Sequence, residues 1–123
     1  MTRNHYEDDL QMQVAQYLDL KRWLWNHTAN ERKTTIRAGG RLKKKGVKAG
    51  VPDVMIYEKW RFGGMQPAKC AREGFGVAIE LKIGRNKPTP AQADWLNALK
   101  ERGWSVHVCR TLDEVIEACR VIG

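Results

Sequence analysis

The sequence predicts an α/β or α+β domain built on a mixed β-sheet, and three observations support this prediction. Residues 5–20 repeat their apolar side chains with the period of a helix, whereas residues 75–83 alternate with the period of a strand. Two further segments begin with helix-start signals, at Thr89 and Thr111. The chain has 123 residues, so we expect residues 1–123 to form one domain.

The N-terminal half of the chain is expected to begin with the amphipathic helix at 5–20. One face of this helix carries four largely apolar residues and two polar ones: Glu7, Leu10, Gln11, Val14, Tyr17 and Leu18. Asp8 falls on the opposite, polar face. A first strand is expected at 23–29, followed by a short helix at 34–45 and a second strand at 51–57.

The C-terminal half contains the clearest strand pattern. Residues 58–76 contain four Gly and one Pro without a clear period, which predicts a long connection. The strand at 75–83 then places Glu80 and Lys82 on the same face. Three elements complete the chain: a helix over 90–103, a strand at 104–110 and a last helix that begins after Thr111.

Several classes of protein are disfavoured by composition. No apolar run approaches the ~20 residues of a membrane span, and the polar, acidic start is unlike a signal peptide. The three cysteines are odd in number and widely spaced, which disfavours a disulfide framework and a structural zinc site. We therefore expect a cytoplasmic protein with reduced cysteines and no membrane partner.

The net charge of +8 is concentrated in one segment, residues 32–48, called here the basic strip. It contains eight cations and no acid: Arg32, Lys33, Arg37, Arg41, Lys43, Lys44, Lys45 and Lys48. The other 14 basic residues balance the 14 acidic ones. A solvated loop is one interpretation. We favour a DNA-binding surface, because the strip leads directly to Asp53 and an acidic site needs nearby cations to admit phosphate.

Two short segments combine acids with strands: Gly50-Val-Pro-Asp53, and Glu80-Leu-Lys82. If strand 51–57 pairs with strand 75–83, Asp53 joins Glu80 and Lys82 on one face. Two carboxylates beside an ammonium suit Mg²⁺, which polarises a phosphodiester and activates water. The alternative is a buried ion pair, or two exposed acids on a half-solvated strand.

Glu7 and Gln92 are candidates with two interpretations each. Both lie on the inward face of their predicted helices, which favours a role in the site. Glu7 could instead be the third residue of a capping box begun by Asn4, and Gln92 the corresponding partner of Thr89. The two roles are compatible.

These segments together resemble the VRR-NUC domain, a branch of the PD-(D/E)xK nuclease superfamily. The matching pieces occur in family order over nearly the whole chain: Glu7–Gln11, Asn30 with the Gly-rich stretch after it, Gly46–Asp53, Glu80–Lys82 and Pro90–Gln92. The resemblance implies a restriction-endonuclease-like αβββαβ core and phosphodiester hydrolysis that depends on Mg²⁺ or Mn²⁺. It also implies the roles of the site residues. Asp53, Glu80, the Leu81 carbonyl and Glu7 would bind the metal, and Asp53, Glu80 and Lys82 would be the catalytic residues. Gln92 and Gln11 would support the site.

The leading hypothesis is therefore a metal-dependent DNA endonuclease, with DNA-binding residues Arg37, Arg41, Lys43, Lys44, Lys45 and Lys48. Stand-alone family members of this size resemble phage and bacterial proteins that act as homodimers, some on four-way (Holliday) junctions. Symmetric cutting of two strands requires two active sites, which a two-fold dimer supplies. We thus expect a homodimer selective for branched DNA, in a bacterial or phage-infected cell. The alternatives are a non-catalytic nucleic-acid-binding module, and a nuclease for flaps, nicks or RNA.

Overall fold

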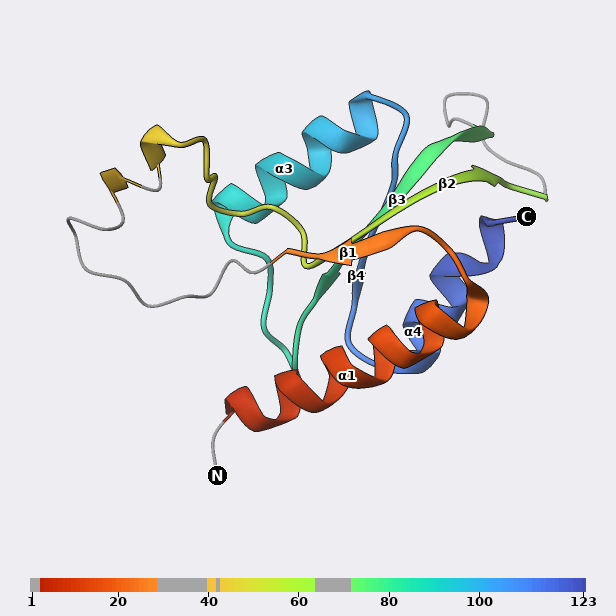
Figure 1. The fold of residues 1–123 in the computed structure, drawn as a ribbon, viewed down its shortest axis with the longest axis horizontal. Helices are drawn as coiled ribbons and strands as arrows, with labels where there is room; N and C mark the ends of the chain where they lie inside the picture. Colours follow the sequence, from red (N-terminus) through yellow and green to blue (C-terminus); the bar gives the residue numbers. More distant parts are fainter. Residues whose placement is uncertain (1–2, 29–39, 42, 64–71) are drawn as a thin grey trace.

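Four strands form a mixed sheet with helices on both faces (Figure 1). The computed structural model describes residues 3–28, 40–41, 43–63 and 72–123. The elements follow one another as α1 (Arg3–Lys21), β1 (Trp25–His27), β2 (Val54–Arg61), β3 (Glu73–Leu81), α3 (Pro90–Glu101), β4 (Ser105–Cys109), α4 (Leu112–Ala118) and a short 3₁₀ helix, η1 (Cys119–Val121). The strand order is β1-β2-β3-β4. β1, β2 and β3 pair antiparallel, and β4 pairs parallel to β3 after the crossover through α3. The predicted mixed-sheet fold with an αβββαβ order is confirmed.

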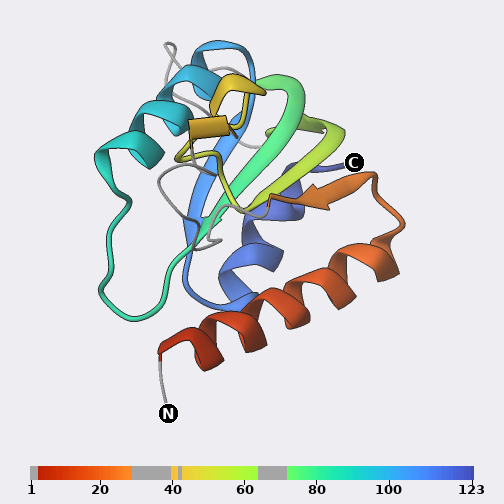
Figure 2. The same cartoon turned by 60° about the vertical axis from the view of Figure 1, so that its left-hand side comes forward.

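The sheet separates two apolar layers. α1 and α4 pack on one face, whereas α3 covers the other (Figures 1 and 2). The larger layer joins α1 to the sheet through buried Leu10, Val14 and Leu18, which confirms the predicted inward face of this helix. Burial of such side chains supplies the main force that holds α1 on the sheet, about 1.5–3 kcal/mol each.

The predicted long connection at 58–76 is wrong at both ends. β2 continues to Arg61 and β3 begins at Glu73, so that these two residues pair across a hairpin. Two glycines of this segment, Gly74 and Gly76, permit close contacts within the sheet. A Cβ on Gly74 would lie 2.2 Å from the Gly103 carbonyl oxygen, and Gly76 has a φ of +95° against the ring of Trp104. A loop-like composition therefore marks tight packing here.

Several strand boundaries also differ from the predictions. β1 covers only residues 25–27, β2 begins at Val54, and β3 ends at Leu81. Lys82 thus follows the strand and does not belong to it, although it still reaches Glu80. Of the helix predicted at 34–45, residues 40–41 and 43–44 are helical. Residues 34–39 and 42 lie outside the described residues.

α3 and α4 begin where their capping signals predict. The Gln92 N–H donates to Thr89 Oγ1 at 3.2 Å, and Gln92 Oε1 accepts from the Thr89 N–H at 2.8 Å. This reciprocal capping box confirms the structural interpretation of Gln92. By contrast, Asn4 lies inside α1, which begins at Arg3, and not at the N-cap position that the capping box proposed for Glu7 requires. Within the described part of the chain, no helix has the length and apolarity to cross a membrane.

Candidate functional site

The site lies at one edge of the sheet, where β2 begins and β3 ends. In the antiparallel register Val54 pairs with Ile79. Asp53, which precedes Val54, therefore lies opposite Glu80, which follows Ile79. The pairing anticipated from the sequence does bring these two acids together.

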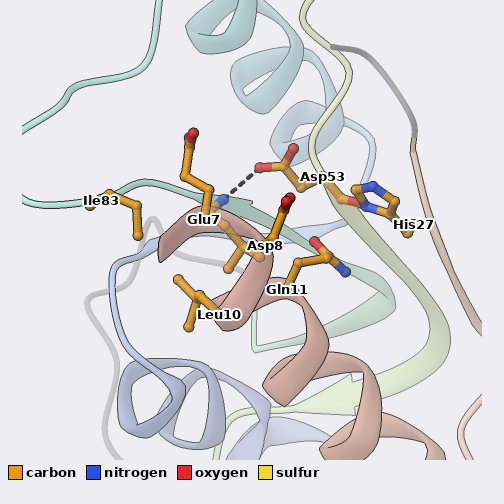
Figure 3. Close-up of a pocket in the computed structure, with 8 residues that line it drawn as sticks. Glu7, Asp8, Leu10, Gln11, His27, Asp53 and Ile83 are labelled. Atoms are coloured by element: carbon orange, nitrogen blue, oxygen red, sulfur yellow. Dashed lines mark hydrogen bonds between the residues drawn. The ribbon is translucent and has the colours of Figure 1, made fainter. Parts of the chain in front are cut away.

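Asp53 is held from two sides. The Leu81 N–H donates to its carboxylate Oδ2 at 2.8 Å (Figure 3). Its backbone carbonyl accepts from the Thr28 N–H at 2.8 Å and lies 3.0 Å from His27 Nδ1. A carbonyl oxygen can only accept, so Nδ1 carries the proton in this contact. The side chain of Asp53 is thereby fixed relative to the end of β3.

Glu80 is the most deeply buried acid among the described residues, at 1% exposure. Its Oε2 lies 3.4 Å from Lys82 Nζ, which forms an ion pair. Its Oε1 is buried and has no hydrogen-bond partner in the described structure. A buried carboxylate oxygen without a partner is costly, so Oε1 is available to a cation or to a proton.

The Asp53 carboxylate raises the cost of ionising Glu80. Burial, followed by the neighbouring charge of Asp53, raises the pKa of Glu80 to about 8. Burial also raises the pKa of Asp53, although the Leu81 N–H opposes that rise. Raised pKa values of two neighbouring acids are a feature that functional sites often show.

A divalent cation fits this donor set. Asp53 and Glu80 supply two carboxylates, and the carbonyl of Leu81 belongs to the residue whose N–H already fixes Asp53. Mg²⁺ is commonly held by one or two carboxylates and keeps several of its waters. Within the described parts of the chain, no three His, Cys, Asp or Glu side chains come close enough to hold a metal together. The donors therefore suit a partly hydrated Mg²⁺ or Mn²⁺, and not a tetrahedral zinc site.

A pocket opens beside Asp53, between α1 and the ends of the strands. The residues that line it are Glu7, Asp8, Leu10, Gln11, His27, Asp53, Leu81 and Ile83. Its volume of about 60 Å³ has room for several water molecules. In Figure 3, Glu7 and Asp8 of α1 lie on one side of Asp53, and His27 lies on the other.

Of the remaining predicted residues, some lie in the pocket and others lie outside it. Glu7 and Gln11 line the pocket with Asp53. Gln92 is not among the lining residues, and its Oε1 belongs to the capping box. Arg37 lies outside the described residues. The other predicted DNA-binding residues are exposed: Arg41, Lys43, Lys44, Lys45 and Lys48.

Asp8 and His27 are pocket residues that the sequence did not indicate. Asp8 was expected on the polar face of α1, but near the helix start both it and Glu7 reach the pocket. His27 closes a three-residue strand, and only its contact with the backbone of Asp53 reveals its place. No periodic signal could have identified it.

Comparison with known proteins supports the fold and the resemblance. The chain matched neither a family model nor a curated protein sequence. A solved structure named "VRR_NUC domain protein" is similar to it, with a TM-score of 0.67 and 26% sequence identity. The match covers 93% of this chain and 84% of the other. The chain thus has the restriction-endonuclease-like fold of a nuclease family.

Proposed function

We propose that this protein is a metal-dependent DNA endonuclease that hydrolyses phosphodiester bonds. The main supporting observation is the unpartnered, buried Oε1 of Glu80 beside the carboxylate of Asp53. The ion pair with Lys82 and the similarity to a VRR_NUC domain protein agree with it.

The chain's own residues would bind the ion and orient the reactants. Asp53, Glu80 and the Leu81 carbonyl would hold Mg²⁺ or Mn²⁺, with Glu7 of the pocket as an additional acid near the ion and not in a three-acid cluster around it. When bound, such an ion polarises the phosphodiester and lowers the pKa of water. Lys82 Nζ, next to Glu80 Oε2, would donate hydrogen bonds to the attacking water or to a phosphate oxygen.

The proposal is tested by a panel of DNA substrates: a four-way junction, a flap, a nicked duplex and a linear duplex. Each is incubated with Mg²⁺, with Mn²⁺ and with EDTA. We expect metal-dependent cleavage, fastest on the four-way junction. Absence of metal-dependent cleavage on all four substrates would overturn the proposal, and binding without cleavage would indicate a non-catalytic module.

We further propose that the active form is a homodimer. Symmetric cutting of a four-way junction requires two active sites, and a two-fold dimer is the simplest assembly that supplies them. Light scattering at micromolar concentration should give twice the 14.1 kDa chain mass, free or with junction DNA. A monomer under both conditions would contradict this expectation.

Removal of charge from the basic strip is expected to weaken DNA binding without affecting the metal site. The triple variant Lys43→Gln, Lys44→Gln, Lys45→Gln should reduce the slope of log Kd against log salt by up to ~3, because each phosphate contact contributes about 0.9. The matched control replaces three exposed cations at the far end of the β2–β3 hairpin: Lys59, Arg61 and Arg72. An unchanged slope in the strip variant would show that the strip is only a solvated loop.

Two isosteric variants test whether His27 positions Asp53. Asn places its amide N–H where Nδ1 donates to the Asp53 carbonyl, whereas Gln places it near Nε2. We expect His27→Gln to lower kcat about tenfold and to weaken Mn²⁺ binding, and His27→Asn to retain most of both, because the carbonyl contact orients a metal ligand. Activity retained by His27→Gln but lost by His27→Asn would instead indicate direct contact of Nε2 with the substrate.

A further inference from the structure

The loop between β3 and α3, residues 82–89, is held in place by one arginine. Arg110 Nε donates to the Gly84 carbonyl at 2.9 Å, and Arg110 Nη2 donates to the Asn86 carbonyl at 2.7 Å. Within the loop, the Asn86 N–H donates to the Ile83 carbonyl at 3.2 Å. One guanidinium thus fixes two backbone positions of a turn, in the planar geometry that only arginine provides.

Arg110 is itself held by the start of α4. The backbone N–H of Arg110 donates to Glu114 Oε1 at 2.7 Å, and the backbone N–H of Glu114 donates to Thr111 Oγ1 at 3.1 Å. The capping residues of α4 therefore set the position of the arginine. The loop is anchored to a helix start, although it is far from that helix in sequence.

Both ends of the loop are also fixed. At its beginning, the Lys82 N–H donates to the Cys109 carbonyl at 3.0 Å, and the next residue, Ile83, lines the pocket. At its end, Thr89 forms the capping box of α3. The loop therefore runs from the candidate site to the first turn of α3 in a defined conformation.

Arg85 and Lys87 are exposed on this loop. The sequence has no acid between Lys82 and Asp94, so no acid close in sequence offsets these charges. Ile83, two residues before Arg85, lines the pocket, which is acidic, with Glu7, Asp8 and Asp53 also among its lining residues. A polyanion that enters the pocket would need cations nearby.

The described end of the basic strip, residues 43–48, leads to the same part of the molecule from another direction. Gly50, two residues after the strip, lies against α3, since a Cβ there would be 2.6 Å from the carbonyl carbon of Ala91. In Figures 1 and 2 the segment before Gly50 and the β3–α3 loop leave the start of α3 in different directions. Exposed cations therefore lie in both of the segments that lead to the start of α3.

We propose that Arg85 and Lys87 form a second phosphate-binding surface for DNA, and that Arg110 is the positioning residue that holds it. The proposal rests on the proposed function and adds a surface to it. With the scissile phosphate at the metal site, the backbone continues in two directions, one toward the strip and one toward the loop. A loop already held by its backbone loses little conformational freedom when it binds, so its contacts contribute more fully to affinity.

The first test compares the double variant Arg85→Gln, Lys87→Gln with a matched remote control, Lys59→Gln, Arg61→Gln. Affinity for a four-way junction is measured in EDTA over a range of KCl concentrations, so that cleavage does not interfere. We expect the loop variant to bind about tenfold more weakly, with a log–log salt slope reduced by up to ~2, and the control to match wild type. Equal affinity and slope in the loop variant and wild type would overturn the loop surface.

The second test concerns Arg110. Arg110→Lys keeps the charge but cannot bridge two carbonyls, so we expect it to weaken junction binding in the wild-type background and to have no further effect with Arg85→Gln, Lys87→Gln. Additive losses in the combined variant would overturn the positioning role. Retained Mn²⁺-induced thermal stabilisation in each variant checks that the site and the fold are intact.

The two proposals fail in distinguishable ways. If the wild-type protein binds DNA without cleaving it, and the Arg85→Gln, Lys87→Gln variant binds more weakly, the nuclease proposal is contradicted and the loop surface is supported. If the wild-type protein cleaves DNA, and this variant binds and cleaves equally well, the nuclease is supported and the loop surface is contradicted. Failure of the wild-type protein to bind any DNA would overturn both.

Discussion

Asp53→Asn and Glu80→Gln, each introduced singly, are expected to abolish metal-dependent cleavage and to leave DNA affinity nearly unchanged. Each substitution keeps the size of the side chain but removes a negative charge from the pair that would hold the metal. Loss of a group that stabilises charge in the transition state costs about 10²–10³-fold in kcat, and loss of the metal costs more. The basic strip, which would supply most of the affinity, is untouched.

The measurement pairs a single-turnover cleavage assay with a binding assay in EDTA. Glu101→Gln is a suitable control, because Glu101 is an exposed acid at the end of α3. Lys82→Ala should also lose cleavage and keep binding, and unchanged turnover in that variant would refute its catalytic role. Cleavage retained by Glu80→Gln would remove the central support for the metal site.

The metal-free protein is expected to lose stability as the pH rises from about 4.5 to about 8. Burial and the nearby Asp53 raise the pKa of Glu80 from 4.5 to about 8 in the folded state. Between these values the folded protein binds more protons than the unfolded chain, so its free energy of unfolding falls with rising pH. The contribution of this carboxyl is fully present below 4.5 and is lost as the pH passes through 8.

A divalent metal should reverse this loss. It binds the ionised carboxylates, so stabilisation by Mg²⁺ should grow with pH over the same window. Urea unfolding at pH 5 to 9, in EDTA and in Mg²⁺, measures both effects. Burial lowers the pKa of His107, so this residue makes the free energy of unfolding rise with pH below about 6.5, opposite to the effect of Glu80. The difference between wild type and Glu80→Gln therefore isolates the carboxyl, and an identical pH dependence of the two proteins would contradict the prediction.

Helices were predictable because their signals are local. The inward stripe of α1 and the capping residues Thr89 and Thr111 act within one or two turns, and the structure confirms all three. Strand ends were less predictable, because a glycine in a sheet and a glycine in a loop look alike in sequence. Gly74 and Gly76 belong to β3 since Trp60 and Trp104, which are distant in the chain, fill the space that their side chains would occupy.

The sequence by itself determined which groups could perform the chemistry. Asp53, Glu80 and Lys82 stand out because an acid within an apolar strand requires a reason, and the period of two places residues i and i+2 on one face. Only the tertiary structure decided how these groups are held. It brought His27 and the Leu81 N–H onto Asp53, left Glu80 Oε1 buried without a described partner, and anchored the β3–α3 loop through Arg110. These contacts join segments more than 20 residues apart, and they depend on strand register and side-chain packing, which no local pattern encodes.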